Sequence, residues 1–432
     1  MSASGRITSR EQVLTRIRQL AEIGKISDTG VSRLAMTPLD RQAVELARQW
    51  MTEAGMSVRL DAAGNLIGRL ESPVAPDSPV LMLGSHLDTQ PYAGRFDGII
   101  GVLGAIEAVH AFVSEGLVPQ RPIEVVAFSD EEGCRFNKGI FGSRAMVGRL
   151  EEGELERADA DGITRSEALS IFGGDSTRLD EAKYEAGSIA AYLELHIEQG
   201  PVLESLDAAC GLVTGISGPL WLTVDLHGFA GHAGSVPMSM RRDALAGAAR
   251  IIAGLQDLVR TEAGTPAVGT VGTLQLFPGS RNIIPERVQF TIDLRDMDME
   301  RRDRLEAKLR ERIDEVAVDN SLTYSIREDT NSPPRYCNPE LMDVIRTEAA
   351  AMGLQLPELM SGPFHDALAL SYACPYAMIF VRSKDGISHN PQEYSSADDI
   401  AEGVELLYRT LRSLALSNQG ERSGGKWEST TA

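Results

Sequence analysis

Histidines and carboxylates lie in this sequence at spacings that suit a metal site. His86 and Asp88 follow an apolar run, and residues two apart on an extended strand point to the same side. This arrangement suits a metal-bound imidazole whose second nitrogen is held by a carboxylate. Asp97 comes eleven residues after His86, directly before a predicted helix, where an aspartate on its own is also typical of an N-cap.

Three further segments carry the same residue types. Residues 129–133 (SDEEG) end a second apolar run, and their adjacent carboxylates repel each other unless a cation or solvent screens them. Taken alone, this segment is most simply a solvated loop. An alternating stretch at 193–200 presents Glu194, His196 and Glu198 on one strand face, and His389 lies in a loop after a predicted strand.

These residues allow either one metal ion or two. Two histidines, an aspartate and a glutamate would hold one ion, whereas three histidines, a glutamate and a shared aspartate suit two ions about 3.5–4 Å apart. Nitrogen and carboxylate ligands without thiolate favour Zn²⁺, Mn²⁺ or a similar ion over Cu(I) or iron–sulfur clusters. A second glutamate beside the ligands would be free to act as a general base, which indicates metal-assisted hydrolysis.

The elements that must position these residues follow an α/β order. The pattern predicts a hairpin from strands 57–60 and 66–70, and strands 80–83 and 123–128 on either side of a helix at 98–113. Such apolar strands are typical of a sheet that helices cover on both faces. Open sheets of this kind bind ligands at the carboxyl ends of their strands, where His86 and the SDEEG segment lie.

A different order of elements predicts a second domain within the first. Residues 217–327 read as strand 219–227, helix 239–260, strand 267–276, strand 286–294, helix 299–317 and strand 321–327. This βαββαβ order is ferredoxin-like. We therefore expect an inserted domain at 217–327 and a discontinuous catalytic domain, with a mixed helix-covered sheet, at 1–216 and 328–415. The polar residues 416–432 predict a disordered tail.

Composition excludes several classes of partner. The 432 residues carry 42 Lys+Arg against 62 Asp+Glu, a net charge of −20 that repels nucleic acid and anionic membranes. No run of eighteen apolar residues predicts a membrane span, and the first ten residues lack the apolar core of a signal peptide. The four cysteines form no CxxC pair and are typical of reduced thiols, so we expect a cytoplasmic protein.

Seven separated blocks resemble one known family, in the order expected for it. They are GSHLDTQPYAGRFDGIIGVLGAIEA, SDEEGCRFNKGIFGSRAMVG, ELHIEQGPVLE, GHAGSVPMSMRRDAL, RNIIPERVQFTIDLRD, SGPFHDALALS and MIFVRSKDGISHNPQEY. These blocks look like the hydantoinase/carbamoylase group of dinuclear metallohydrolases, which comprises N-carbamoyl-L-amino-acid hydrolases, allantoate amidohydrolases and β-ureidopropionases. The group is related to the aminoacylase/carboxypeptidase metallopeptidases, and the resemblance covers residues 8–415.

The resemblance implies two divalent metal ions, Zn²⁺ or Mn²⁺, with Co²⁺ or Ni²⁺ as further candidates. One ion would be held by His86, Asp97 and His196, and the other by Asp97, Glu132 and His389. Asp97 would then bridge the two ions.

The resemblance also implies roles in catalysis. Glu131 would be the general base, and Asp88 would be the carboxylate that orients His86. His232, in the inserted domain, would enter the site of a partner subunit and stabilise the reacting carbonyl, so a homodimer is expected.

Four residues match positions that bind substrate in the group: Gln199, His232, Asn282 and Arg295. Arg295 would hold a substrate carboxylate with two parallel hydrogen bonds, for which a planar guanidinium is better suited than lysine. The implied substrate is therefore a small anion that carries a carboxylate.

The chain departs from the group's pattern near the expected pocket. Phe364 replaces a glycine of the usual SGAGHD, and Gly231 replaces the usual asparagine before His232. Neither change touches a metal ligand, so hydrolysis is still expected while the pocket differs. His365 has two interpretations, a contact to the site or a loop histidine with its own hydrogen bonds.

The predicted reaction is hydrolysis of the ureido C–N bond of N-carbamoyl-L-amino acids to the amino acid, CO₂ and NH₃. Allantoate amidohydrolase or β-ureidopropionase activity is the first alternative, and hydrolysis of N-acyl amino acids or dipeptides is the second. The presence of Gln199, Asn282 and Arg295 disfavours hydrolysis of N-acyl amino acids or dipeptides. A non-catalytic binding protein is a remote alternative, because all five metal ligands and Glu131 are present. Phe364 favours an apolar side chain over allantoate.

Overall fold

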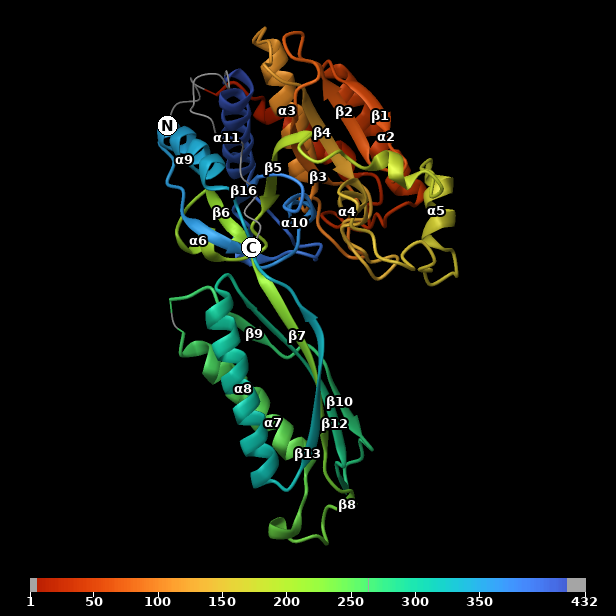
Figure 1. The fold of residues 1–432 in the computed structure, drawn as a ribbon, viewed down its shortest axis with the longest axis vertical. Helices are drawn as coiled ribbons and strands as arrows, with labels where there is room; N and C mark the ends of the chain where they lie inside the picture. Colours follow the sequence, from red (N-terminus) through yellow and green to blue (C-terminus); the bar gives the residue numbers. More distant parts are fainter. Residues whose placement is uncertain (1–5, 263, 418–432) are drawn as a thin grey trace. The chain divides into compact units, whose positions relative to one another are not determined.

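The computed structural model describes residues 6–262 and 264–417, which separate into two units (Figure 1). The first unit contains the chain up to Thr214, Cys337–Leu359 and the chain from Phe364 onward. The second contains Gly215–Tyr336 and Met360–Pro363. Most of the tail predicted at 416–432 lies outside the described residues.

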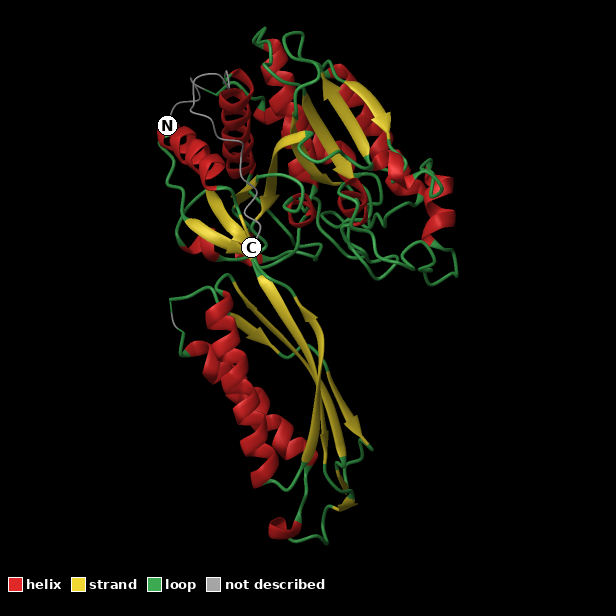
Figure 2. Cartoon of the chain, viewed as in Figure 1, coloured by secondary structure: helices red, strands yellow, loops and turns green. Residues whose placement is uncertain are grey.

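The first unit is built on a mixed sheet with helices against it (Figure 2). Its strands are β1 (Ser57–Leu60), β2 (Leu66–Leu70), β3 (Val80–His86), β4 (Ile123–Phe128), β5 (Ile189–Ile197), β6 (Cys210–Ile216), β15 (Glu358–Ser361) and β16 (Tyr376–Val381). They follow the order β1-β2-β4-β3-β5-β16-β6, with β15 beside β6. Strands β4, β3, β5 and β16 run parallel, and the β1–β2 hairpin is antiparallel as predicted. The prediction of a helix-covered mixed α/β sheet is confirmed.

The helices of this unit bury the two faces of the sheet. They are α1 (Arg10–Ala21), α2 (Pro38–Glu53), α3 (Ile99–Ser114), α4 (Phe141–Met146), α5 (Arg165–Phe172), α6 (Val202–Ser205), α9 (Pro339–Met352), α10 (Asp366–Leu370) and α11 (Ala397–Leu416), with 3₁₀ turns η1 (Leu179–Ala182) and η3 (Lys384–Gly386). Leu195 of β5 points at α3 and α11, so His196 beside it points to the opposite face, toward α10. A Cβ on Gly101 of α3 would lie 2.6 Å from Ser85 Cβ, so only glycine permits this close packing.

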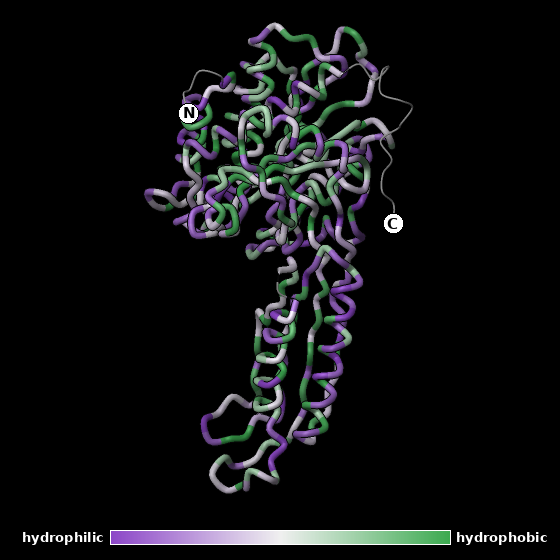
Figure 3. The backbone as a smooth tube through the Cα atoms, turned by 90° about the vertical axis from the view of Figure 1, so that its left-hand side faces the viewer, coloured by the Kyte–Doolittle hydropathy of each residue, from purple (hydrophilic) through white to green (hydrophobic). Residues whose placement is uncertain are grey.

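The second unit has an antiparallel sheet of five strands with two long helices. Its elements are β7 (Gly218–His227), β8 (Gly231–His232), η2 (Met238–Met240), α7 (Ala244–Arg260), β9 (Val268–Thr270), β10 (Leu274–Phe277), β11 (Ile283–Ile284), β12 (Arg287–Asp296), α8 (Met299–Asp319), β13 (Thr323–Asn331) and β14 (Arg335–Tyr336). The sheet order is β10-β12-β7-β13, with β9 also on β12, while β8 and β11 form a separate pair. Buried and partly exposed residues alternate along β12, and apolar and polar residues mix along these strands in Figure 3. The buried set packs against α7 and α8.

Two predicted elements of this unit differ from the structure. The single strand expected at 267–276 is wrong, because residues 271–273 interrupt it between β9 and β10, where three residues lie opposite two residues of β12. The helix expected to begin at 239 begins at Ala244, because the Asp243 side chain caps it by accepting from Leu245 and Ala246 N–H. No helix within the described part of the chain is long and apolar enough to cross a membrane.

Candidate metal centre

The predicted metal ligands lie at the ends of neighbouring parallel strands or in the loops directly after them. His86 ends β3, Glu131 and Glu132 follow the end of β4, and His196 lies one residue before the end of β5. His389 comes after β16. Because β4, β3, β5 and β16 are adjacent and parallel, their carboxyl ends meet at one edge of the sheet.

Three imidazoles converge on the carboxylate of Asp97. The Nε2 atoms of His196 and His86 lie 3.0 and 3.7 Å from Asp97 Oδ1, and His389 Nε2 lies 3.2 Å from Oδ2. Glu132 Oε2 is 3.6 Å from His389 Nε2. The structure therefore forms two donor groups, His86–Asp97–His196 and Asp97–Glu132–His389, that share Asp97.

Main-chain carbonyls set the tautomers of the two buried histidines. His86 Nδ1 lies 3.0 Å from the Asp88 carbonyl oxygen, and His196 Nδ1 lies 2.9 Å from that of Ile197. A carbonyl only accepts, so both Nδ1 atoms carry hydrogen, and the neutral rings turn the lone pair of Nε2 toward Asp97. Lone pairs that face a carboxylate need a cation or a proton between them, so this donor set fits a metal.

Where no metal is bound, a proton on Nε2 can take the place of the cation between an imidazole and the Asp97 carboxylate. Burial alone would lower the pKa of His196, but the hydrogen bond and the charge of Asp97 raise it to about 9. The hydrogen bond to Asp97 likewise raises the pKa of His389 to about 9. For His86, burial dominates and lowers the pKa to about 4.

Asp97 is not the N-cap of the helix that follows it. The N-cap of α3 is Gly98, and no side chain caps the helix. Interpreting Asp97 as a helix cap is therefore wrong, which leaves its carboxylate to the histidines.

Asp88 contacts His86 differently from the contact expected. Its main-chain carbonyl makes the hydrogen bond to His86, whereas its carboxylate oxygen Oδ1 is 3.7 Å from Nδ1. The two carboxylate oxygens instead accept from the main-chain N–H groups of Glu131 and Glu132, each at 3.2 Å. Asp88 thus ties the β3 end to the β4 end.

Glu131 and Glu132 point into the same centre with different neighbours. Glu131 Oε2 lies 3.6 Å from His86 Nε2, and burial together with the charges of Asp366 and Glu132 raises the pKa of Glu131 well above its usual range. Glu132 accepts from Gln90 N and Nε2, at 3.2 and 2.6 Å. Burial and the charge of Asp97 raise the pKa of Glu132 to about 8.

Gln199 joins the cluster from the loop after β5. Its backbone is left-handed, with φ 58°, and its Nε2 donates to Asp97 Oδ2 at 2.8 Å and to Ser388 Oγ at 3.1 Å. The structure therefore places this predicted substrate residue beside the shared carboxylate.

His365 also belongs to this region. Its buried ring packs edge-on against His196, with 4.3 Å between ring centroids, and Glu194, His196 and His365 form a third group of donor atoms. Glu194 accepts from Ser85 Oγ at 2.7 Å and from Ala367 N–H at 3.0 Å. Sequence reasoning gave Glu194 no role, although the alternation along β5 places it on the same face as His196.

The remaining predicted residues lie in the second unit. His232 ends β8 opposite Ile283, and its Nδ1 accepts from Gly234 N–H at 3.1 Å, with Ser235 Oγ at 3.0 Å. Because a main-chain N–H only donates, Nδ1 carries no hydrogen and the neutral ring donates from Nε2. The Asn282 carbonyl accepts from Ala233 N–H at 2.9 Å, so Asn282 and His232 belong to one loop pair.

Arg295 lies near the end of β12 in the five-stranded sheet, far from the β11–β8 pair that carries His232. It pairs with Pro219 across β7, whereas Arg287 at the other end of β12 pairs with His227. Its guanidinium binds the Asp293 carboxylate through Nε and Nη2, at 2.9 and 2.8 Å, and Nη1 donates to the Gly362 carbonyl. The fork expected to hold a substrate carboxylate thus holds a carboxylate of the protein.

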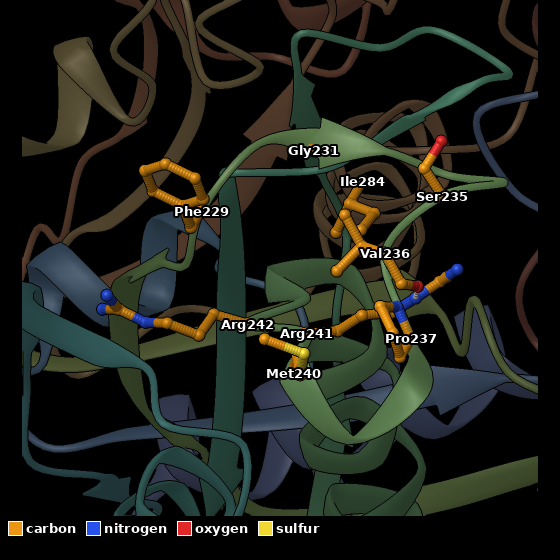
Figure 4. A pocket seen from close by; sticks show the side chains of 9 residues that line it. All are labelled: Phe229, Gly231, Ser235, Val236, Pro237, Met240, Arg241, Arg242 and Ile284. Carbon is orange, nitrogen blue, oxygen red and sulfur yellow. Dashed lines mark hydrogen bonds between the residues drawn. The ribbon is translucent and has the colours of Figure 1, made fainter.

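A cavity of about 300 Å³ in this unit is lined in part by Gly231, the residue before His232 (Figure 4). Its lining is mostly apolar and consists of Phe229, Gly231, Ser235, Val236, Pro237, Met240, Arg241, Arg242 and Ile284. Gly231, one of the two departures from the group's pattern, is part of this lining and pairs with Ile284.

Comparisons with known proteins show which proteins this chain is similar to. The model of peptidase family M20/M25/M40 matches residues 82–413. The chain is 44% identical over 405 residues to an N-carbamoyl-L-amino-acid amidohydrolase of Pseudomonas sp. (strain NS671), covering 93% of this chain and 98% of the relative. It is 36% identical over 423 residues to an allantoate deiminase of Arabidopsis thaliana, covering 90% and 80%. A hydantoinase/carbamoylase family amidase from Burkholderia ambifaria has a similar structure, with a TM-score of 0.88, 36% identity and coverage of 94% and 98%.

Proposed function

Because the chain belongs to peptidase family M20/M25/M40, and within it to the hydantoinase/carbamoylase amidohydrolases, we propose that it hydrolyses N-carbamoyl-L-amino acids. Water would cleave the ureido C–N bond to give the amino acid and carbamic acid, which breaks down to CO₂ and NH₃. The observation that carries this proposal is the convergence of three imidazoles and Glu132 on Asp97, with Glu131 left over beside them.

Two divalent ions, Zn²⁺ or Mn²⁺ with Co²⁺ or Ni²⁺ as further candidates, suit the two donor groups. His86, Asp97 and His196 would hold one ion, and Asp97, Glu132 and His389 the other. Such ions, when bound, lower the pKa of water toward about 7 and polarise a carbonyl. The family is metal-dependent, and because the Nδ1 hydrogens of His86 and His196 are donated to carbonyls, Nε2 is the atom of each ring that would bind a metal.

Glu131 is placed to move the proton of the reaction. It would accept a proton from water as the water oxygen attacks the ureido carbonyl carbon, and then donate it to the departing amine nitrogen. A raised pKa, which burial and neighbouring carboxylates cause, brings a carboxyl closer to the range useful for this exchange. The main-chain N–H of Glu131 donates a hydrogen bond to Asp88 Oδ1, which holds Glu131 in place.

His232 would stabilise the developing negative charge on the carbonyl oxygen. Its Nδ1 accepts from Gly234 N–H, so Nε2 has the hydrogen that an oxyanion needs. Arg287 and Arg295 are eight residues apart along β12, which corresponds to a distance of about 26 Å along the strand at 3.3 Å per residue. His232 belongs to the Arg287 end through β11, so one chain cannot bring both His232 and Arg295 to one small substrate.

In a homodimer, the His232 and the Arg295 that act on one substrate would come from different chains. We propose that residues 217–327 form a ferredoxin-like lid and dimerisation domain, which carries His232 to the partner's site, and that 1–216 and 328–415 form the catalytic domain. The strand order β10-β12-β7-β13 with two helices supports the ferredoxin-like assignment. Arg295 and Gln199 would bind the substrate, with its carboxylate replacing Asp293 on Arg295, while Asn282 of the partner subunit would reach it together with His232 of the partner subunit.

A substrate panel tests the proposal. The metal-reconstituted enzyme would be given N-carbamoyl-L-amino acids, N-carbamoyl-β-alanine, allantoate, and N-acyl amino acids or dipeptides. We expect the highest kcat/KM for an N-carbamoyl-L-amino acid. Allantoate is the second candidate because of the allantoate deiminase relative, and a preference for allantoate would replace the first assignment. Turnover of N-acyl substrates alone would overturn both.

A further inference from the structure

Glu393 is a buried carboxylate in the loop between β16 and α11, and it is not one of the predicted site residues. Its exposed fraction is 2%. Oε1 accepts from the main-chain N–H groups of Phe96 and Asp97, at 2.9 and 3.2 Å, and Oε2 accepts from Ser388 Oγ at 3.1 Å. One side chain therefore joins the segment of Asp97 to the segment of His389, which are almost 300 residues apart.

The surroundings hold Glu393 firmly in this position. A Cβ on Gly94 would lie 2.4 Å from Glu393 Cβ, so the chain before Asp97 wraps closely around the glutamate. On its own loop, Glu393 N–H donates to the Asn390 carbonyl at 2.9 Å, which closes the turn after His389. Because its surroundings are tightly packed, the Glu393 side chain has little room to shift with the Asp97 segment or the His389 segment if the other segment moves.

Ser388 extends this link to the shared carboxylate. Its Oγ lies 3.1 Å from Glu393 Oε2 and 3.0 Å from Asp97 Oδ2, the oxygen that faces His389. Residues that hold metal ligands in place change metal affinity by about 10- to 100-fold when they are replaced.

We propose that Glu393 is a positioning residue for the second metal set, Asp97–Glu132–His389. It fixes the main chain of Asp97 and, through Ser388, the loop that presents His389. This inference rests on the metal sets of the proposed function.

Equilibrium titration of the metal-free full-length protein with Co²⁺ tests the role, read by absorbance and by bound metal per chain. We expect Glu393→Ala to weaken the second ion by about 10- to 100-fold and to affect the first ion less. Glu393→Gln should restore most of this affinity, because its carbonyl oxygen can still accept from Phe96 and Asp97.

The chain offers a closely matched control in Glu405. This glutamate is also 2% exposed, and its Oε2 accepts from the N–H groups of Ile7 and Thr8 and from Thr8 Oγ1. Glu405→Ala should lose comparable stability and keep both ions. Equal weakening in Glu393→Ala and Glu405→Ala, or unchanged binding in Glu393→Ala, would overturn the role of Glu393. Failure of the unmodified protein to bind two ions would instead overturn the proposed function.

Discussion

At the scale of single residues, hydrogen bonds to the main chain decide how the side chains of the centre are presented. The carbonyls of Asp88 and Ile197 take the Nδ1 hydrogens of His86 and His196, which leaves both Nε2 atoms to Asp97. The carboxylate of Asp88 in turn holds the N–H groups of Glu131 and Glu132. The two histidines are thus oriented by carbonyls of their own strand ends, and the two glutamates by a carboxylate from the neighbouring strand end.

Replacing Glu131 by glutamine tests the general base. An amide cannot accept and return the proton, so we expect kcat to fall by about 10²–10⁴-fold while two ions remain bound. Steady-state rates and metal analysis measure the two effects. Exposed Glu152→Gln is the control, and a Glu131→Gln enzyme with normal kcat would refute the assignment.

Arg295→Ala should selectively impair substrates that carry a carboxylate. Hydrogen bonds to charged groups contribute about 1.5–3 kcal/mol, so kcat/KM should drop by about 10- to 100-fold. The drop should be much smaller for the carboxamide analogue of the same substrate. Arg295→Lys should restore only part of the activity, because lysine lacks the fork that binds Asp293 here. Loss of metal binding to the same extent as kcat/KM would contradict the role.

At the scale of elements, the start of α3 shapes the metal centre through a glycine. Gly98 has φ 68°, and a Cβ there would lie 2.4 Å from the His86 ring. A side chain at this position would therefore push His86 away from Asp97. The helix can begin so close to the ligands only because residue 98 has no side chain.

Gly98→Ala should weaken metal binding, and Gly116→Ala is its matched control. Gly116 has φ 69° but nothing within 4 Å of its Cβ position, so both variants share a backbone strain of about 1–2 kcal/mol. Thermal unfolding should show similar losses of stability in the metal-free proteins. Calorimetric metal titration should show weaker binding for Gly98→Ala alone, and identical affinities would exclude the contact with His86.

At the scale of the whole molecule, the metal sets join chain segments that are distant in sequence. Asp97, Glu132 and His389 come from connections after three different strands, and His196 comes from the end of a fourth strand of the same sheet. Ions bound there would act as crosslinks of the folded first unit. A few of the 62 acidic residues, among them Asp97, Glu131 and Glu132, gather where a divalent cation can neutralise them.

Removing the metal should lower the thermal stability of the protein. Ligands that bind only the folded state stabilise it by about 2.7 kcal/mol at a hundredfold excess over Kd. Differential scanning calorimetry with a chelator should therefore show a lower Tm for one transition, restored when Zn²⁺ or Mn²⁺ is added back. A Tm that is insensitive to chelator and metal would argue against resident ions.

Much of the fold and of the candidate site could be predicted from local patterns. The apolar runs of β3 and β4 and the hairpin of β1 and β2 follow from residue type and periodicity alone. The expected strand at 267–276 failed, because its interruption at residues 271–273 arises where three residues lie opposite two residues of another strand, β12. Periodicity within a segment contains no information about such a partner.

The sequence by itself determined which residues can bind metal and that they follow the ends of strands, because ligand chemistry and strand patterning are local properties. Only the tertiary structure decided that Asp88 uses its carbonyl on His86 and that Glu393 links two ligand loops. It also decided that Arg295 binds Asp293 and lies far from His232. These contacts depend on where each main-chain and side-chain group points once the strands are paired in register, which residue type and spacing alone do not specify.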